Sequence, residues 1–252
     1  MTMRGRPRVV LLHGVGLDHT MWEPVVERLS TVADVLTPDL LGHGGRAPVA
    51  SGLTLGDLAR DVVEALDEPV HLVGFSLGGL VAQEIGIEYP AKVRSLTLVS
   101  TVADRSDEQR LAVRRRYERA AESFEASAHA AVDRWFGPSL RATRPELPDT
   151  ILTTLLGNDR TSYLAAYRVF AEADGELWPR TAHISVPTLV VTGDRDGGST
   201  PAMTHRLAAR IPGARARIID DAAHLLPLER PTELAAAIRN HLAESQNLTE
   251  TP

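Results

Sequence analysis

Six short apolar runs, each followed by a longer stretch with helical periodicity, constrain the fold of this 252-residue chain more than any other feature. The runs lack a strict alternation of polar and apolar residues, which is typical of strands buried on both faces. Strands that alternate with helices predict the α/β class, with a mostly parallel, doubly wound sheet covered on both faces. The six predicted strands are Arg8–His13, Val32–Thr37, Pro69–Phe75, Val93–Ser100, Val186–Thr192 and Ala216–Asp220.

The strand pattern stops after Ser100 and resumes at Val186. Helical periodicity fills the gap, so we expect a helical insertion within the sheet that forms a cap, or lid, over its end. The predicted domains are a core of residues 1–103 and 184–252 and a cap of residues 104–183. The helices expected in the cap are Asp107–Ala121, Phe124–Trp135, Asp149–Leu156 and Thr161–Ala173.

Composition excludes several classes of function. The net charge of -6 argues against nucleic acid as a partner. No apolar run approaches the roughly 18 residues that span a membrane, and the basic N-terminus leads into too short an apolar run for a signal peptide, so we expect a cytoplasmic protein. The absence of cysteine removes disulfides, thiolate metal sites and cysteine nucleophiles. We predict no metal and no cofactor.

The strongest local motif is Gly74-Phe75-Ser76-Leu77-Gly78, which fits the pattern G-x-S-x-G between a predicted strand and a helix expected over Leu80–Glu88. Glycines on both sides let a serine stand on a sharp turn, where it can act as a nucleophile. The helix N-terminus and the Leu77 N–H would then face a developing oxyanion. A turn in which Ser76 only caps the helix is the alternative.

A base and an acid follow later strands, where parallel sheets place their sites. His224 follows the last predicted strand, and Asp194 and Asp196 follow the strand before it. The chain order Ser76, Asp196, His224 suits a nucleophile, an orienting acid and a general base. The residues alone do not separate Asp194 from Asp196.

These motifs resemble those of the α/β-hydrolase family. Gly193-Asp194-Arg195-Asp196 is similar to the family's G-x-x-D, in which the second acid is catalytic, and this favours Asp196. His13-Gly14-Val15-Gly16 resembles the family's H-G-x-G, which implies that the Val15 N–H is the second oxyanion donor. Two further segments, Asp39–Gly44 and His224–Pro231, resemble the family's D-x-x-G-x-G turn and the H-x-x-x-x-E-x-P pattern.

Aromatic residues gather in the predicted cap, although they make up only 4% of the chain. We expect them to line a pocket for a small, mostly apolar acyl substrate, with Trp22 either at its mouth or packed under the loop. A stripe of this kind also suits a helix that packs against its own core, and that alternative stays open. The candidate substrate-binding residues are Trp22, Trp135, Phe136, Tyr163 and Tyr167.

The resemblance implies a serine hydrolase that acts on a small carboxylic ester or lactone through an acyl-enzyme on Ser76, as in carboxylesterases and enol-lactonases. One alternative is a C–C bond hydrolase, for which Arg141, Arg144 or Arg168 would anchor a carboxylate; another is a cofactor-free haloperoxidase-like enzyme. An alternative of another class is a weakly catalytic ligand-binding homologue. The expected partner is the small-molecule substrate, and a homodimer is left open.

Overall fold

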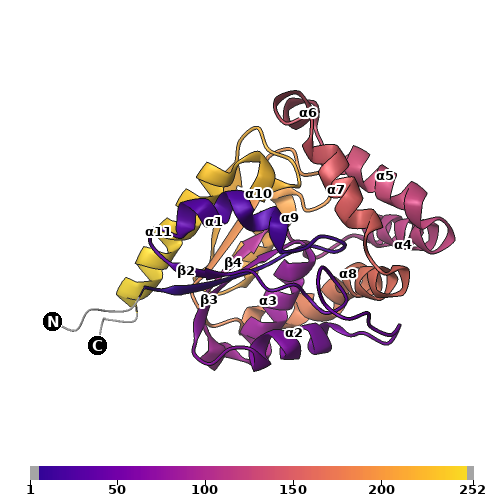
Figure 1. Cartoon of the computed structure of the whole chain (residues 1–252). Helices are drawn as coiled ribbons and strands as arrows, with labels where there is room; N and C mark the ends of the chain where they lie inside the picture. The colour runs from indigo at the N-terminus through magenta and orange to yellow at the C-terminus, as the bar shows by residue number, and fades with distance from the viewer. Residues whose placement is uncertain (1–5, 249–252) are drawn as a thin grey trace.

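The computed structural model describes residues 6–248, which fold around a six-stranded sheet (Figure 1). The strand order is β2-β1-β3-β4-β5-β6, and every neighbouring pair is parallel. The chain runs outward from β1 to β2 and then returns across β1 to β3, so the direction of winding reverses between β1 and β3. The strands are β1 (Arg8–Leu12), β2 (Asp34–Leu36), β3 (Val70–Phe75), β4 (Val93–Val99), β5 (Thr188–Gly193) and β6 (Arg215–Ile219).

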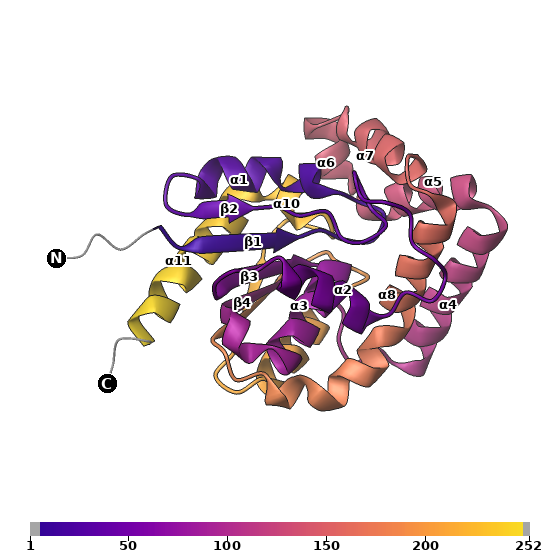
Figure 2. The same ribbon diagram turned by 60° about the horizontal axis from the view of Figure 1, so that its bottom comes forward.

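Helices cover both faces of this sheet. α1 and α11 pack against each other on one face, while α2 and α3 lie on the other (Figures 1 and 2). The central strand β3 is buried along its whole length, as its continuous apolarity predicts. The predicted doubly wound α/β class is therefore confirmed. The core helices are α1 (Glu23–Leu29), α2 (Leu55–Glu64), α3 (Leu77–Glu88), α9 (Pro201–Arg210), α10 (Leu226–Glu229) and α11 (Pro231–Leu248), with 3-10 turns at His19–Trp22, Pro90–Lys92 and Thr181–His183.

The predicted helical insertion is present between β4 and β5. In both views its helices gather beyond one end of the sheet (Figures 1 and 2). They are α4 (Asp107–Glu122), α5 (Phe124–Trp135), α6 (Pro138–Thr143), α7 (Leu147–Leu156) and α8 (Arg160–Arg180). We propose that residues 104–183 form the cap, since this range begins after the end of β4 and ends before the start of β5.

Two features of the insertion differ from the prediction. The short helix α6 was not expected, because Pro138 suggested a break; the first turn of a helix tolerates proline, which lacks an N–H that would have no acceptor there. α8 continues past Ala173 to Arg180, with Pro179 inside its last turn, where it lacks the N–H for one helical hydrogen bond.

Side-chain caps fix where the two longest cap helices begin. The Ser106 hydroxyl accepts from the Gln109 N–H, and the Gln109 side chain accepts from the Ser106 N–H in return. The Asp159 carboxylate accepts from the Ser162 N–H at 2.8 Å at the start of α8. These residues therefore satisfy N–H groups that have no acceptor inside the helix.

None of the helices in residues 6–248 combines the length and the apolar composition that a membrane crossing requires.

Candidate active site

Ser76 stands at the turn from β3 into α3 with a positive φ of 53° and a ψ of -111°. A side chain rarely adopts this conformation, and the glycines around it make it sterically feasible. A Cβ on Gly74 would lie 2.1 Å from the Gly78 carbonyl oxygen, and a Cβ on Gly78 would lie 2.4 Å from the Leu12 oxygen. The turn therefore depends on glycine at both positions, as the motif indicates.

The backbone of Ser76 is held on both sides. Its N–H donates to the Val99 oxygen at 2.9 Å, and its carbonyl accepts from the Thr101 hydroxyl at 2.9 Å. Within the described chain the Ser76 hydroxyl makes no capping hydrogen bond to α3, which begins at Leu77 and not at Leu80 as predicted. The alternative in which Ser76 serves only as a helix cap is therefore wrong.

His224 and Asp196 lie in contact. The His224 Nδ1 donates to the Asp196 Oδ2 at 2.8 Å, and the Asp196 side chain is 1% exposed. The other carboxylate oxygen accepts from the backbone N–H groups of Gly198 and Ser199, both at 2.8 Å. This bonding holds the carboxylate in place and orients the imidazole with its Nε2 directed away from the acid.

Asp194 has a different contact. Its Oδ1 accepts from the Ala222 N–H at 3.0 Å, and so it joins the loop after β5 to the loop that carries His224. The two loops approach closely because position 193 is glycine; a Cβ there would lie 2.2 Å from the Ala222 oxygen. Of the two candidate acids, Asp196 alone contacts the histidine.

The amides of Val15 and Leu77 are free donors at this end of the sheet. Within residues 6–248 neither N–H has a hydrogen-bond acceptor. The Gly14 carbonyl accepts from the Leu17 N–H at 3.2 Å and from the His13 Nδ1 at 2.8 Å. In a trans peptide the N–H points opposite to the C=O, so these two bonds aim the Val15 N–H away from His13 and Leu17.

His13 is held in its neutral form. Its Nε2 accepts from the Leu40 N–H at 2.9 Å, which requires an unprotonated nitrogen. Burial lowers the pKa of His13 to about 4, and burial together with the nearby His13 lowers the pKa of His43 to about 3. The two rings pack edge to face with centroids 5.0 Å apart. These contacts give both histidines a structural role.

A cavity of about 420 Å³ opens at His224. Its wall includes Val15 from the core and Trp135 and Tyr167 from the cap. The Trp135 ring stacks on His224 with centroids 5.9 Å apart, and the Phe75 ring lies 5.1 Å from the same imidazole. His224 therefore lies between Phe75, the residue before Ser76, and Trp135 of the cap.

The other candidate substrate-binding residues do not line this cavity. Trp22 is completely buried in the core against Phe75, so it cannot stand at the pocket mouth as expected. Phe136 is buried in the cap, and Tyr163 lines an adjoining cavity of about 320 Å³ between α4, α5 and α8, which shares three residues of its wall with the first, Arg116, Arg134 and Tyr167. The alternative in which the aromatic stripe packs against its own core applies to these residues.

Ser76 itself is 3% exposed and is not part of the cavity wall. Among the described residues no hydrogen bond joins its hydroxyl to His224. Hydrogen bonds of this kind are often long in the absence of substrate and tighten when it binds.

A model of the alpha/beta hydrolase family matches residues 9–237. The chain belongs to this family. In Acinetobacter baylyi, 3-oxoadipate enol-lactonase 1 is 31% identical to this chain, covering 89% of it and 84% of the lactonase. From the same organism, (E)-2-((N-methylformamido)methylene)succinate hydrolase is 29% identical over 93% of the chain and 89% of the hydrolase. A solved structure of an esterase from Thermogutta terrifontis, with malate bound, is 30% identical to this chain and has a TM-score of 0.84. The match covers 95% of this chain and 90% of the esterase.

The prediction of an alpha/beta hydrolase is thus confirmed. In the family's final motif, the Glu229 Oε2 accepts from the Ala223 N–H at 2.8 Å and so supports the loop before His224. Burial raises the pKa of this carboxyl. Within the part of the chain that the structure describes, no cluster of three or more His, Asp or Glu side chains is arranged to hold a metal ion.

The positive charge of the cavity wall was not predicted from the sequence. Arg141 pairs with Asp133 and Arg144 with Glu146, and Arg168 donates to backbone carbonyls; none of these three proposed carboxylate anchors is in the cavity wall. Arg105 could have been found by the rule that identified Asp196 and His224, because it also follows the end of a strand. The arginines in the wall are Arg105, Arg116, Arg134 and Arg195.

Proposed function

We propose that the protein is a serine hydrolase that cleaves a small carboxylic ester or lactone through an acyl-enzyme on Ser76. The observation that carries the proposal is the buried hydrogen bond from His224 to Asp196, at the same end of the sheet as a strained serine and two free backbone amides. This set contains a nucleophile, a base, an orienting acid and oxyanion donors.

In the proposed reaction the Ser76 oxygen attacks the acyl carbon while the His224 Nε2 takes its proton. The N–H groups of Val15 and Leu77 stabilise the oxyanion, and the buried Asp196 carboxylate stabilises the imidazolium. His224 then gives the proton to the departing alkoxide, which stays tethered in a lactone. Water hydrolyses the acyl-enzyme by the same steps, with His224 again as the base, and this restores Ser76.

The known relatives support an ester or lactone as the substrate. The chain is 31% identical to an enol-lactonase and 30% identical to a solved esterase. Ester and lactone hydrolysis requires only the groups described above, with no group beyond the triad and the two amides.

Covalent labelling tests the nucleophile. A fluorophosphonate should label the wild type at Ser76, which peptide mass spectrometry would locate, and Ser76→Ala should lower kcat for 4-nitrophenyl acetate by about three orders of magnitude or more. Ser100 is a matched internal control, since it is a buried serine with positive φ after the neighbouring strand and should stay unlabelled. A protein without labelling or a burst of nitrophenol would be the ligand-binding homologue and not an enzyme.

A further inference from the structure

The charge of the cavity wall is opposite to that of the whole chain. The chain has a net charge of -6, yet four arginines face this cavity. The only carboxylate in the wall, Asp196, is already bonded to His224. Arg195 pairs with Asp221 at 2.6 Å and Arg105 with Asp174 at 2.7 Å, which leaves the charges of Arg116 and Arg134 without a partner. A cavity of this kind attracts anions.

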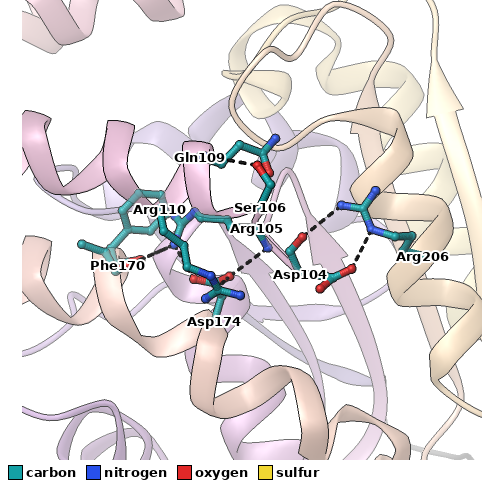
Figure 3. A network of polar contacts seen from close by, with 9 residues as sticks. Asp104, Arg105, Ser106, Gln109, Arg110, Phe170, Asp174 and Arg206 are labelled. Atoms are coloured by element: carbon teal, nitrogen blue, oxygen red, sulfur yellow. Dashed lines mark hydrogen bonds and ion pairs between the residues drawn. The ribbon is translucent and has the colours of Figure 1, made fainter.

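Arg105 is the most buried of these side chains, at 3% exposed. Its Nη1 donates to the Asp174 Oδ1 at 2.7 Å and to the Phe170 carbonyl at 3.0 Å, and its backbone N–H donates to the Asp174 Oδ2 at 3.1 Å. Arg110 contacts Asp174 as well, at 3.5 Å (Figure 3). Asp174 therefore fixes one edge of the Arg105 guanidinium.

The opposite amine of Arg105 has no partner. Its Nη2 is buried and, within the described residues, has no hydrogen-bond acceptor. A buried donor on a charged group without an acceptor is costly, so native structures rarely keep one without a function or a bound group. Two N–H bonds on a planar guanidinium match the oxygens of a carboxylate.

Arg116 and Arg134 add positive charge that no carboxylate balances. Neither forms an ion pair within residues 6–248. Burial is the main cause that lowers the pKa of Arg105, and the charge of Arg116 lowers it further. The unpaired charges of Arg116 and Arg134 repel each other and the guanidinium of Arg105, and a bound anion would relieve this repulsion.

We propose that Arg105, Arg116 and Arg134 form a subsite for a free carboxylate of the substrate, so that the enzyme prefers esters or lactones that carry a carboxylate away from the bond that is cleaved. The inference rests on the proposed function and extends it. Hydrolysis with one water would release a dicarboxylate, an alcohol and a proton from an ester, or a hydroxylated dicarboxylate and a proton from a lactone. The acyl end would lie at His224 and the second carboxylate at the arginines.

Two substrates of nearly equal size test this preference. They are 4-nitrophenyl hydrogen adipate, which carries a free carboxylate, and its methyl ester, which is neutral. Wild type should show a kcat/KM about 10- to 100-fold higher for the acid, as expected for a hydrogen-bonded ion pair. Arg116→Gln and Arg105→Lys should each lower this ratio about 10-fold, mainly through the KM of the acid.

Arg115→Gln is the matched control for Arg116→Gln. Arg115 is the neighbouring residue on α4, it is exposed, it is outside the cavity wall, and the substitution changes the net charge equally. In Arg115→Gln the ratio of kcat/KM for the acid to that for the methyl ester should equal the wild-type ratio. Arg116 is half-buried without an ion-pair partner, so Arg116→Gln still tests the subsite if Arg105→Lys does not fold.

Equal kcat/KM values for the two esters in the wild type, or a ratio that Arg116→Gln leaves unchanged, would overturn the subsite while the hydrolase remains. Failure to hydrolyse either ester would instead contradict the proposed function. In that case calorimetry with adipate separates the two proposals. Binding of adipate to the wild type that weakens about 10-fold in Arg116→Gln, but not in Arg115→Gln, would support the subsite, and no binding would overturn it.

Discussion

The carboxyl end of the sheet and the helical insertion position their side chains in different ways. At the carboxyl end of the sheet, glycines let neighbouring backbone segments approach closely and so fix the backbone. Buried hydrogen bonds hold the Asp196 carboxylate and the Gly14 peptide there. In the insertion, arginine and aromatic side chains reach the cavity from helices, and Arg116 lacks an ion-pair partner within residues 6–248. We therefore propose that the chemical step belongs to the first region and the choice of substrate to the second.

The largest effect should come from substituting the two acids at the carboxyl end of the sheet. Asp196→Asn should lower kcat by about 10⁴-fold for every ester, because an amide donor facing Nδ1 would leave the proton on the His224 Nε2, which could then no longer act as a base. Asp194→Asn should change kcat less than about tenfold, since the amide oxygen can still accept from the Ala222 N–H. Steady-state kinetics of both variants measure this difference.

If Asp194→Asn were the more damaging substitution, Asp196 would not be the catalytic acid. If Asp196→Asn changed the preference between two esters and not the rate of both, the proposed separation between the two regions would be wrong.

The second effect is a loss of stability at low pH, and it comes from histidines buried in the core. Burial lowers the pKa of His13, His43 and His71 to about 4, 3 and 4. The unfolded chain takes up protons below about pH 6.5, whereas the folded core does not until near pH 4, so stability is full above pH 6.5 and falls as the pH is lowered. His19, whose pKa is raised by its hydrogen bond to Asp39, is protonated in both states below pH 6.5 and so affects the slope only above that pH. Between about pH 6 and pH 5 these three imidazoles should contribute about one proton each to the slope, each worth about 1.4 kcal/mol per pH unit, and His241, whose pKa burial also lowers, adds to it.

Urea unfolding at pH 7, 6 and 5 measures this slope. His71→Asn should reduce it by about one proton, because it removes one buried imidazole. His129→Asn, on an exposed position of α5 in the insertion, should leave the slope unchanged. A stability that stays constant from pH 7 to pH 5 would contradict the prediction.

The third effect tests the contact between the two regions. Trp135 is the residue of the insertion that stacks on His224, with an angle of 30° between the rings. Trp135→Leu should lower kcat/KM by about two- to tenfold, the usual contribution of an aromatic pair. Trp178→Leu is the control, because Trp178 is also in the insertion but packs under Arg210 outside the cavity. Equal losses in both variants would indicate a general loss of cap stability.

The same contrast explains how much could be predicted from the sequence. All six strands, and the positions of Ser76, Asp196 and His224 at strand ends, follow from local patterns of apolar residues and glycines. Trp22 was assigned to the pocket mouth, although it is fully buried, because the sequence does not show which side of a turn faces the core. The role of Arg105 depends on Asp174, 69 residues later in the chain, and local periodicity carries no information on such a pair.

The smallest effect is a difference in stability at Ser76. Positive φ costs a residue with a Cβ about 1–3 kcal/mol, and glycine avoids most of this cost. Ser76→Gly and Ser76→Ala both remove the hydroxyl, yet we expect the glycine variant to be about 1 kcal/mol more stable in urea unfolding. At Ser127, within α5, the order should be reversed, because glycine in a helix interior is about 0.5–1 kcal/mol less stable than alanine. If alanine were more stable than glycine at both positions, the Ser76 turn would store no strain. Opposite orders of stability would show that the carboxyl end of the sheet holds Ser76 at a cost in stability.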